Sequence, residues 1–76
     1  MIQRMIDTRI DHDETQAELA KAIGFNRVQI AKYENLTNDP PIRYLLAFCK
    51  HYGVSADYIL GLPDNLSWPR KEKKRR

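Results

Sequence analysis

The stretch GFNRVQIAKYEN, residues 24–35, gathers many of the side chains in this sequence whose types and spacing could do chemistry. At about 100° per residue, a helix over this stretch would place Ile30, Tyr33 and Glu34 on one face. The opposite face and its edges would hold cations, amides and one small apolar group: Arg27, Val28, Gln29, Lys32 and Asn35. A glutamate on the inner face and a valine on the outer face each require a physical reason.

The outer group matches the chemistry of base edges in the major groove of DNA. Arginine or lysine can pair with guanine, glutamine or asparagine with adenine, and valine can touch the thymine methyl group. Asn26 stands at the start of the same helix, and we expect it to contact the DNA backbone. We predict that four residues read bases: Arg27, Val28, Gln29 and Lys32. Taken singly, each polar member of this set could instead be a solvated surface residue.

Local capping signals place two helices around this stretch. Thr15 and Glu18 form a capping box at the start of the first, and Gly24 is expected to end it. Asn26 and Gln29 have the same spacing at the start of the second, which should cover residues 27–35. Two helices joined by a short turn that begins with glycine fit a helix-turn-helix, although an ordinary helical hairpin has the same spacing.

The remaining sequence predicts three further helices and no strand. One should cover residues 3–12, where Ile6 and Ile10 lie four apart, and a fifth should begin after Ser55 and help to close the bundle through Tyr58, Ile59 and Leu62. The helix between them should cover residues 42–52 and end at Gly53. Its apolar residues recur as one stripe: Ile42, Leu45, Leu46, Cys49 and Tyr52. The expected fold class is therefore an all-α, compact five-helix bundle.

Composition excludes several classes of protein. With 76 residues the chain has room for one small domain, and no apolar run approaches the roughly 20 residues of a membrane span. The N-terminal residues lack the apolar core of a signal peptide, so we expect a cytoplasmic protein. Cys49 is the only cysteine, and His12 and His51 have no metal-ligand spacing. No nucleophile motif or phosphate loop is present, so we predict no metal, no cofactor and no enzymatic activity.

Charge is distributed unevenly along the chain. Residues 70–76, RKEKKRR, hold six basic residues and one acidic residue, whereas residues 1–69 hold seven basic and nine acidic residues. Such a tail can bind nucleic acid, bind a membrane surface or stay solvated. We expect residues 1–62 to form the helical domain and residues 63–76 a C-terminal extension. Within that extension Trp68 could pack on the bundle, cover a dimer partner or be exposed.

Residues 5–62 resemble the lambda-repressor/Cro-type helix-turn-helix domain, the Xre family of bacterial and phage regulators. The matching strings are TQAELA at 15–20, GFNRVQIAKYEN at 24–35, a proline at 40 and GVSADYILG at 53–61. They occur in the family's order and at its spacing. The resemblance implies a five-helix bundle that binds double-stranded DNA in a sequence-specific way as a homodimer.

The resemblance also implies roles for individual residues. Gln16 matches a glutamine that touches DNA at the start of the family's second helix, and Asn35 matches a phosphate contact. Arg9 and Glu34 match a buried ion pair between the first and third helices, which would account for a glutamate on the inner face. The base-reading positions of the recognition helix fall on Arg27, Val28 and Lys32.

The chain departs from the family at three positions. Leu36 stands where the family usually has glycine, so we expect the third helix to end differently. Glu14 replaces a common apolar residue before the cap at Thr15, and Thr8 replaces a common leucine. These departures affect the expected loop geometry and stability rather than the function.

Together these patterns predict a DNA-binding transcriptional regulator, most simply a repressor. A homodimer would place one recognition helix in each of two half-sites about 34 Å apart, so the operator should be nearly palindromic. The alternative is an antitoxin that binds and neutralises a protein partner and binds DNA only to control its own operon. A toxin-like neighbouring gene would favour the alternative.

Overall fold

A computed structural model of the chain describes residues 1–62, and all of their regular structure is helical. The predicted all-α class is confirmed. The five helices are α1 (Ile2–Asp11), α2 (Gln16–Ile23), α3 (Arg27–Glu34), α4 (Ile42–Tyr52) and α5 (Ala56–Leu60). The predicted first helix, 3–12, is shifted by one residue at each end, and the predicted third helix, 27–35, is one residue too long at its C-terminal end.

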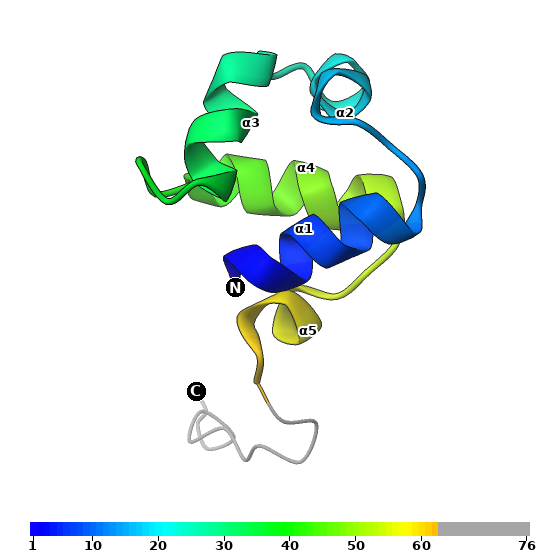
Figure 1. Cartoon of the computed structure of the whole chain (residues 1–76). Coiled ribbons are helices and arrows are strands. Elements are labelled where there is room, and N and C mark those ends of the chain that lie inside the picture. Colours follow the sequence, from blue (N-terminus) through cyan, green and yellow to red (C-terminus); the bar gives the residue numbers. More distant parts are fainter. Residues whose placement is uncertain (63–76) are drawn as a thin grey trace.

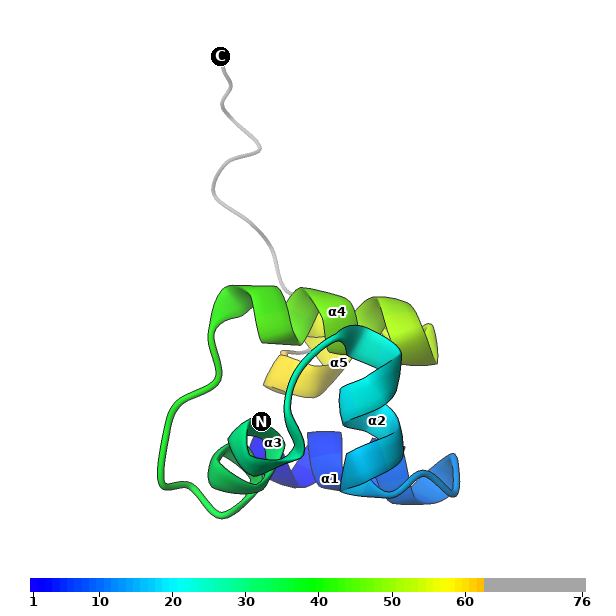
Figure 2. The same cartoon turned by 90° about the horizontal axis from the view of Figure 1, so that it is seen from above.

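The helices are arranged in three levels. α1 and α4 form the middle level, α2 and α3 lie on one side of it, and α5 lies on the other (Figure 1). The view from above shows α2 bridging the space between α1 and α4, with α3 beside α1 (Figure 2). α3 packs against both α2 and α1, while α5 packs against α1 and α4. This arrangement holds α3 at one edge of the bundle, where one side of the helix is left uncovered.

The predicted caps of α2 and α3 are confirmed. The Thr15 side chain accepts a hydrogen bond from the Glu18 amide at 3.1 Å, and the Glu18 carboxylate accepts one from the Thr15 amide at 2.8 Å. Asn26 and Gln29 make the same reciprocal pair at the start of α3. Gly24 has φ of 76°, the left-handed conformation that lets the chain turn between the two helices.

Eight buried residues from all five helices form the core. The buried set is Met5, Leu19, Ala20, Ile30, Tyr33, Tyr44, Phe48 and Ile59. Tyr44 lies at its centre, with ring centroids 4.7 Å from Tyr33 and 5.2 Å from Phe25. Contact with Tyr33 ties the inner face of α3 to α4, so the orientation of α3 depends on this aromatic cluster.

The predicted apolar stripe of α4 is buried only in part. Tyr44 and Phe48 are its buried residues, whereas Ile42 and Leu46, two members of the predicted stripe, are 71% and 55% exposed. The other three members, Leu45, Cys49 and Tyr52, are partly buried against the core. α4 is apolar on several sides, so periodicity alone could not identify the side that the bundle covers.

The buried residues of α1 and α5 were also only partly apparent from the sequence. In α1 the buried positions are Met5 and Thr8, whereas Ile10 is 55% exposed. The Thr8 hydroxyl is satisfied inside the bundle because it donates to the Arg4 carbonyl at 2.7 Å. In α5, Ile59 is buried as expected, but Tyr58 is 48% exposed and lies under the Arg4 guanidinium.

The chain leaves α3 through a left-handed residue that is not glycine. Leu36 has φ of 66° and is 73% exposed. It therefore adopts the conformation that glycine would supply at this position, at a cost in backbone strain. The Thr37 amide then donates to the Lys32 carbonyl at 2.9 Å, which closes the end of the helix.

Helices α1 to α5 include none that is long and apolar enough to cross a membrane. The predicted C-terminal extension, with Trp68 and the basic tail at 70–76, lies outside the described residues.

Candidate DNA-binding surface

The outer face of α3 carries the side chains expected to read bases. Arg27, Val28 and Lys32 are all exposed, and Val28 keeps 52% of its surface accessible. Ile30 and Tyr33 lie on the inner face and are buried in the core. Burial of these two residues fixes the rotation of α3 about its axis, and that rotation turns the cations and the valine outward.

Two of the expected contact residues also cap α3. Asn26 Oδ1 accepts hydrogen bonds from the Val28 amide at 2.9 Å and the Gln29 amide at 3.2 Å. Gln29 is half-buried, and its Oε1 accepts from the Asn26 amide at 3.0 Å. Because these oxygens are engaged, the amide nitrogens of Asn26 and Gln29 are the groups left to donate to an outside acceptor.

Asn35 forms the corresponding end of the surface at the C-cap of α3. Its Oδ1 accepts hydrogen bonds from the backbone amide and the hydroxyl of Thr37. The side-chain NH₂ group of Asn35 is therefore the group left to donate to an outside acceptor such as a phosphate oxygen.

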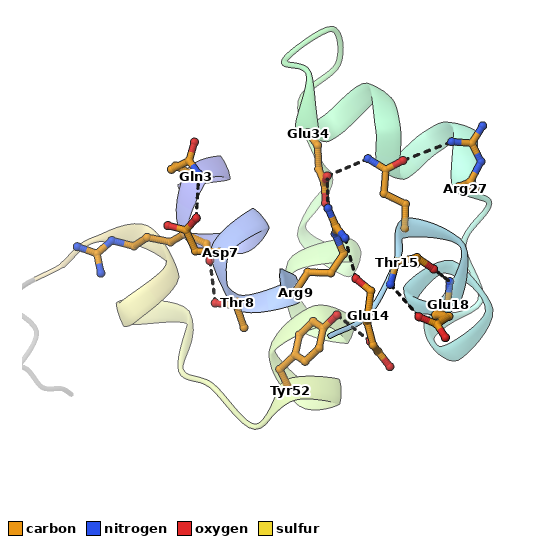
Figure 3. A network of polar contacts seen from close by, with 12 residues as sticks. Gln3, Asp7, Thr8, Arg9, Glu14, Thr15, Glu18, Arg27, Glu34 and Tyr52 are labelled. Atoms are coloured by element: carbon orange, nitrogen blue, oxygen red, sulfur yellow. Dashed lines mark hydrogen bonds and ion pairs between the residues drawn. The ribbon is translucent and has the colours of Figure 1, made fainter. Parts of the chain in front are cut away.

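A nearly buried ion pair connects α3 to α1. Arg9 Nε lies 2.8 Å from Glu34 Oε2, and Arg9 Nη2 donates to Glu34 Oε1 at 3.0 Å (Figure 3). The two side chains are 12% and 10% exposed. The hydrogen bond to Glu34 raises the pKa of Arg9, so the guanidinium is charged at every accessible pH. The structure thus places the partner of Glu34 on another helix, which makes a carboxylate on the inner face tolerable.

Gln16 joins this ion pair to the exposed surface. Its Nε2 donates to Glu34 Oε1 at 2.8 Å, and its Oε1 accepts from Arg27 Nη1 at 3.3 Å. Gln16 is the first residue of α2, directly after the Thr15 cap, so its backbone position is well fixed. The family resemblance implied a DNA contact for Gln16. It did not imply these hydrogen bonds, which connect α2 to both ends of α3.

Glu14 makes contacts that the sequence did not suggest. Its Oε1 lies 2.9 Å from His51 Nε2 and accepts from the Tyr52 hydroxyl at 2.8 Å (Figure 3 shows the Tyr52 contact). These hydrogen bonds lower the pKa of Glu14. The Glu14 carbonyl accepts from Arg9 Nη1 at 2.7 Å, so the segment before α2 is tied to both α4 and α1.

The other polar candidates from the sequence lie away from this surface. His12 is exposed, and its Nδ1 is 2.8 Å from the Thr8 carbonyl oxygen. Cys49 is partly buried beside the core, and burial raises the pKa of its thiol. Residues 1–62 contain no cluster of three or more histidine, cysteine, aspartate or glutamate side chains that could hold a metal ion.

Comparison with known proteins agrees with this geometry. A family model described as Helix-turn-helix (HTH_3) matches residues 9–59, which span α1 from Arg9 through most of α5. The chain is 38% identical over 72 residues to an uncharacterized HTH-type transcriptional regulator, YobD, of Bacillus subtilis. That match covers 95% of this chain and 63% of the relative, so the chain spans less than two thirds of the relative's length. No solved structure matches the chain significantly. On the family match and the five-helix fold, this chain belongs to the Xre-type helix-turn-helix family of DNA-binding transcriptional regulators.

Proposed function

We propose that this chain binds double-stranded DNA in a sequence-specific manner and regulates transcription from the cytoplasm as a homodimer, most simply as a repressor. α3 would enter the major groove, where Arg27, Val28, Gln29 and Lys32 would contact base edges. Gln16, Asn26 and Asn35 would contact the DNA backbone and set the register of the helix on the duplex.

One observation carries this proposal more than any other. The only carboxylate of α3 is Glu34, which is 10% exposed and held by Arg9, whereas both cations of α3 are exposed. The exposed side of the helix therefore presents positive charge and amide donors without a repelling carboxylate. Exposure of the single valine at position 28 costs little free energy in water, and its side chain gains an apolar partner at a thymine methyl group.

The size of the surface supports a homodimer. One eight-residue recognition helix contacts too few base pairs to select a site in a genome, and two copies on adjacent half-sites double that number. We place the dimer contact at α5 and the segment 62–68. Tyr58 and Leu60 of α5 support this placement because they are 48% and 45% exposed.

Selection of bound sequences from a duplex library with randomised base pairs tests the proposal. We expect the wild-type chain to enrich two similar half-sites whose centres lie about 34 Å apart. Sedimentation on the enriched duplex should give two chains per site. Enrichment of no motif, with equal affinity for every duplex, would overturn sequence-specific binding, and one chain per site at saturation would overturn the dimer.

We further propose that residues 1–62 form the sequence-reading domain and that the extension at 63–76 adds affinity without sequence information. Residues 1–69 carry an excess of two acidic residues, and the segment 70–76 carries five net positive charges. Long-range attraction to the phosphate backbone would therefore come mainly from the tail.

A protein-binding role as an antitoxin is the second candidate. Ile42 and Leu46, one turn apart on α4, are 71% and 55% exposed, and adjacent exposed apolar side chains can mark a protein interface. Co-expression with the product of the neighbouring gene tests this role. Rescue of cell growth by this chain, lost in an Ile42→Ser/Leu46→Ser variant that still binds DNA, would support the antitoxin.

A further inference from the structure

A pocket of about 340 Å³ lies between the C-terminal half of α1 and the start of α5. Six residues line it: Thr8, Asp11, His12, Val54, Ser55 and Tyr58. Its volume lies within the range of about 300–1,000 Å³ that is usual for small-molecule sites, and most of its surface is apolar. α5 lies on the opposite side of α1 and α4 from α2 and α3 (Figure 1). A molecule in this pocket therefore need not compete with DNA at α3.

The polar groups that line the pocket are mostly hydrogen-bond acceptors. The Thr8 hydroxyl gives its only hydrogen to the Arg4 carbonyl at 2.7 Å, so its lone pairs are what remains. His12 Nδ1 lies 2.8 Å from the Thr8 carbonyl oxygen, which can only accept, so Nδ1 carries the hydrogen and the neutral ring keeps Nε2 as an acceptor. Ser55 is the exception, because its oxygen accepts from the Tyr58 amide and its hydrogen stays available.

Asp11 gives the rim of the pocket a negative charge. It is the last residue of α1, so its carboxylate lies at the negative end of the helix dipole. Arg9, the basic residue of the same turn, donates instead to the Glu34 carboxylate and the Glu14 carbonyl. Within residues 1–62 the Asp11 carboxylate is exposed and forms no ion pair. The rim should therefore repel an anion and attract a cation that donates hydrogen bonds.

We propose that this pocket binds a small primary amine with a flat apolar body. The ammonium group would lie at Asp11, since it has three hydrogens to donate and no acceptor, as the lining groups require. The apolar body would rest against Val54 and the Tyr58 ring. The Arg4 guanidinium carbon lies 4.8 Å from the centre of that ring, but Arg4 does not line the pocket, so its charge is outside the site.

Phenethylamine is the probe, and phenethyl alcohol and hydrocinnamate are neutral and anionic molecules of similar size and shape. A two-dimensional amide NMR titration of the full chain with each molecule gives its dissociation constant and the backbone amides that it perturbs. We expect phenethylamine to shift the amides of Asp11, Val54 and Ser55. It should bind about fivefold more tightly than the alcohol, the upper end for an exposed ion pair, and hydrocinnamate should bind more weakly than both.

Asp11→Asn tests the contribution of the charge. This change should lower the affinity for phenethylamine about fivefold and leave the affinity for phenethyl alcohol unchanged. Asp7→Asn is the matched control, because Asp7 is an exposed carboxylate one turn earlier on α1 that does not line the pocket. It accepts a hydrogen bond from Gln3 at 2.9 Å (Figure 3). Asp7→Asn should leave both affinities nearly unchanged.

Several results would overturn this proposal and leave the DNA-binding function untouched. One is the absence of shifts at the lining residues with millimolar phenethylamine, and another is equal affinity for the three probes. Equal losses from Asp7→Asn and Asp11→Asn would show general attraction to an acidic surface. Nuclear Overhauser contacts of the Trp68 indole with Val54 or Tyr58 in the protein without probe would assign the pocket to the C-terminal extension instead of an amine.

Discussion

Arg9 and Glu34 are separated by 25 residues in sequence, yet Arg9 Nε and Glu34 Oε2 lie 2.8 Å apart between α1 and α3. Arg9 compensates an unfavourable interaction, since Glu34 is the last residue of α3 and its carboxylate lies at the negative end of the helix dipole. Arg9 supplies two of its donors to the carboxylate and a third to the Glu14 carbonyl. The Arg9 guanidinium therefore connects α1 to α3 and to the segment before α2.

Glu34→Ala should destabilise the domain by about 3 kcal/mol, because it leaves Arg9 nearly buried with no carboxylate and removes an acceptor from Gln16. This loss of stability is at the low end of the range for breaking a buried ion pair, because each side chain keeps about a tenth of its surface exposed. Urea unfolding followed by circular dichroism measures the loss. Replacing both residues with leucine should recover part of it. A midpoint equal to the wild type for Glu34→Ala would show that the pair contributes nothing.

Leu36→Gly should stabilise the domain by about 0.5–1 kcal/mol. Leu36 has φ of 66°, which glycine adopts without strain, and its side chain is 73% exposed, so little packing is lost. Thermal unfolding provides the measurement. Leu46→Gly is the matched control, because Leu46 is exposed within α4 and glycine there should lower stability by about 1 kcal/mol. Destabilisation by both changes would argue against strain at position 36.

The contribution of Glu14 to stability should disappear in acid. Hydrogen bonds from His51 and Tyr52 lower the pKa of Glu14 below its ordinary value of 4.5. A carboxyl group whose pKa is lower in the folded state stabilises the fold above its unfolded pKa and loses this effect as pH falls through the folded pKa. Unfolding midpoints of the wild type and Glu14→Gln should thus differ at pH 5 and converge as the pH falls below 4.5. A difference that does not depend on pH would contradict the assignment.

Arg27→Ala should cost about 1–3 kcal/mol at the selected operator and relax the preference at one position in each half-site. Lys32→Ala tests the next turn of α3 in the same way. Fluorescence anisotropy with the operator and with a scrambled duplex separates the two kinds of contact. Lys50→Ala, which removes an exposed cation from α4, is the control and should leave the preference unchanged. Equal losses on both duplexes would reduce Arg27 to a phosphate contact.

Deletion of residues 70–76 should weaken binding to operator and scrambled DNA by similar factors. The segment holds six of the thirteen basic residues, and each phosphate that it neutralises should add about 0.9 to the slope of log affinity against log salt. Binding measured at several salt concentrations should therefore give a flatter line for the truncated chain, with the same selected motif. An unchanged slope would assign the tail to a protein partner or to simple solvation.

Local signals in the sequence determined where α2, α3 and α5 begin and where α2 and α4 end. The caps at Thr15, Asn26 and Ser55 and the left-handed glycines at positions 24 and 53 all stand where the sequence predicts them. Each depends on hydrogen bonds among residues within five positions of one another, and such contacts form whatever the rest of the chain does. The outward face of α3 was also predicted correctly, since Ile30 and Tyr33 are buried and Val28 and Lys32, on the opposite side of the helix, are exposed.

Tertiary structure decided which apolar faces were buried and how the polar residues were connected. α4 offers apolar residues on several sides, and only the packing of Tyr44 against Tyr33 and Phe25 determined that Ile42 and Leu46 would face outward. The contacts of Glu14 with His51 and of Gln16 with Glu34 span 37 and 18 residues. No pattern of local spacing encodes such contacts, since they exist only once separate helices have been brought together by the burial of a shared core.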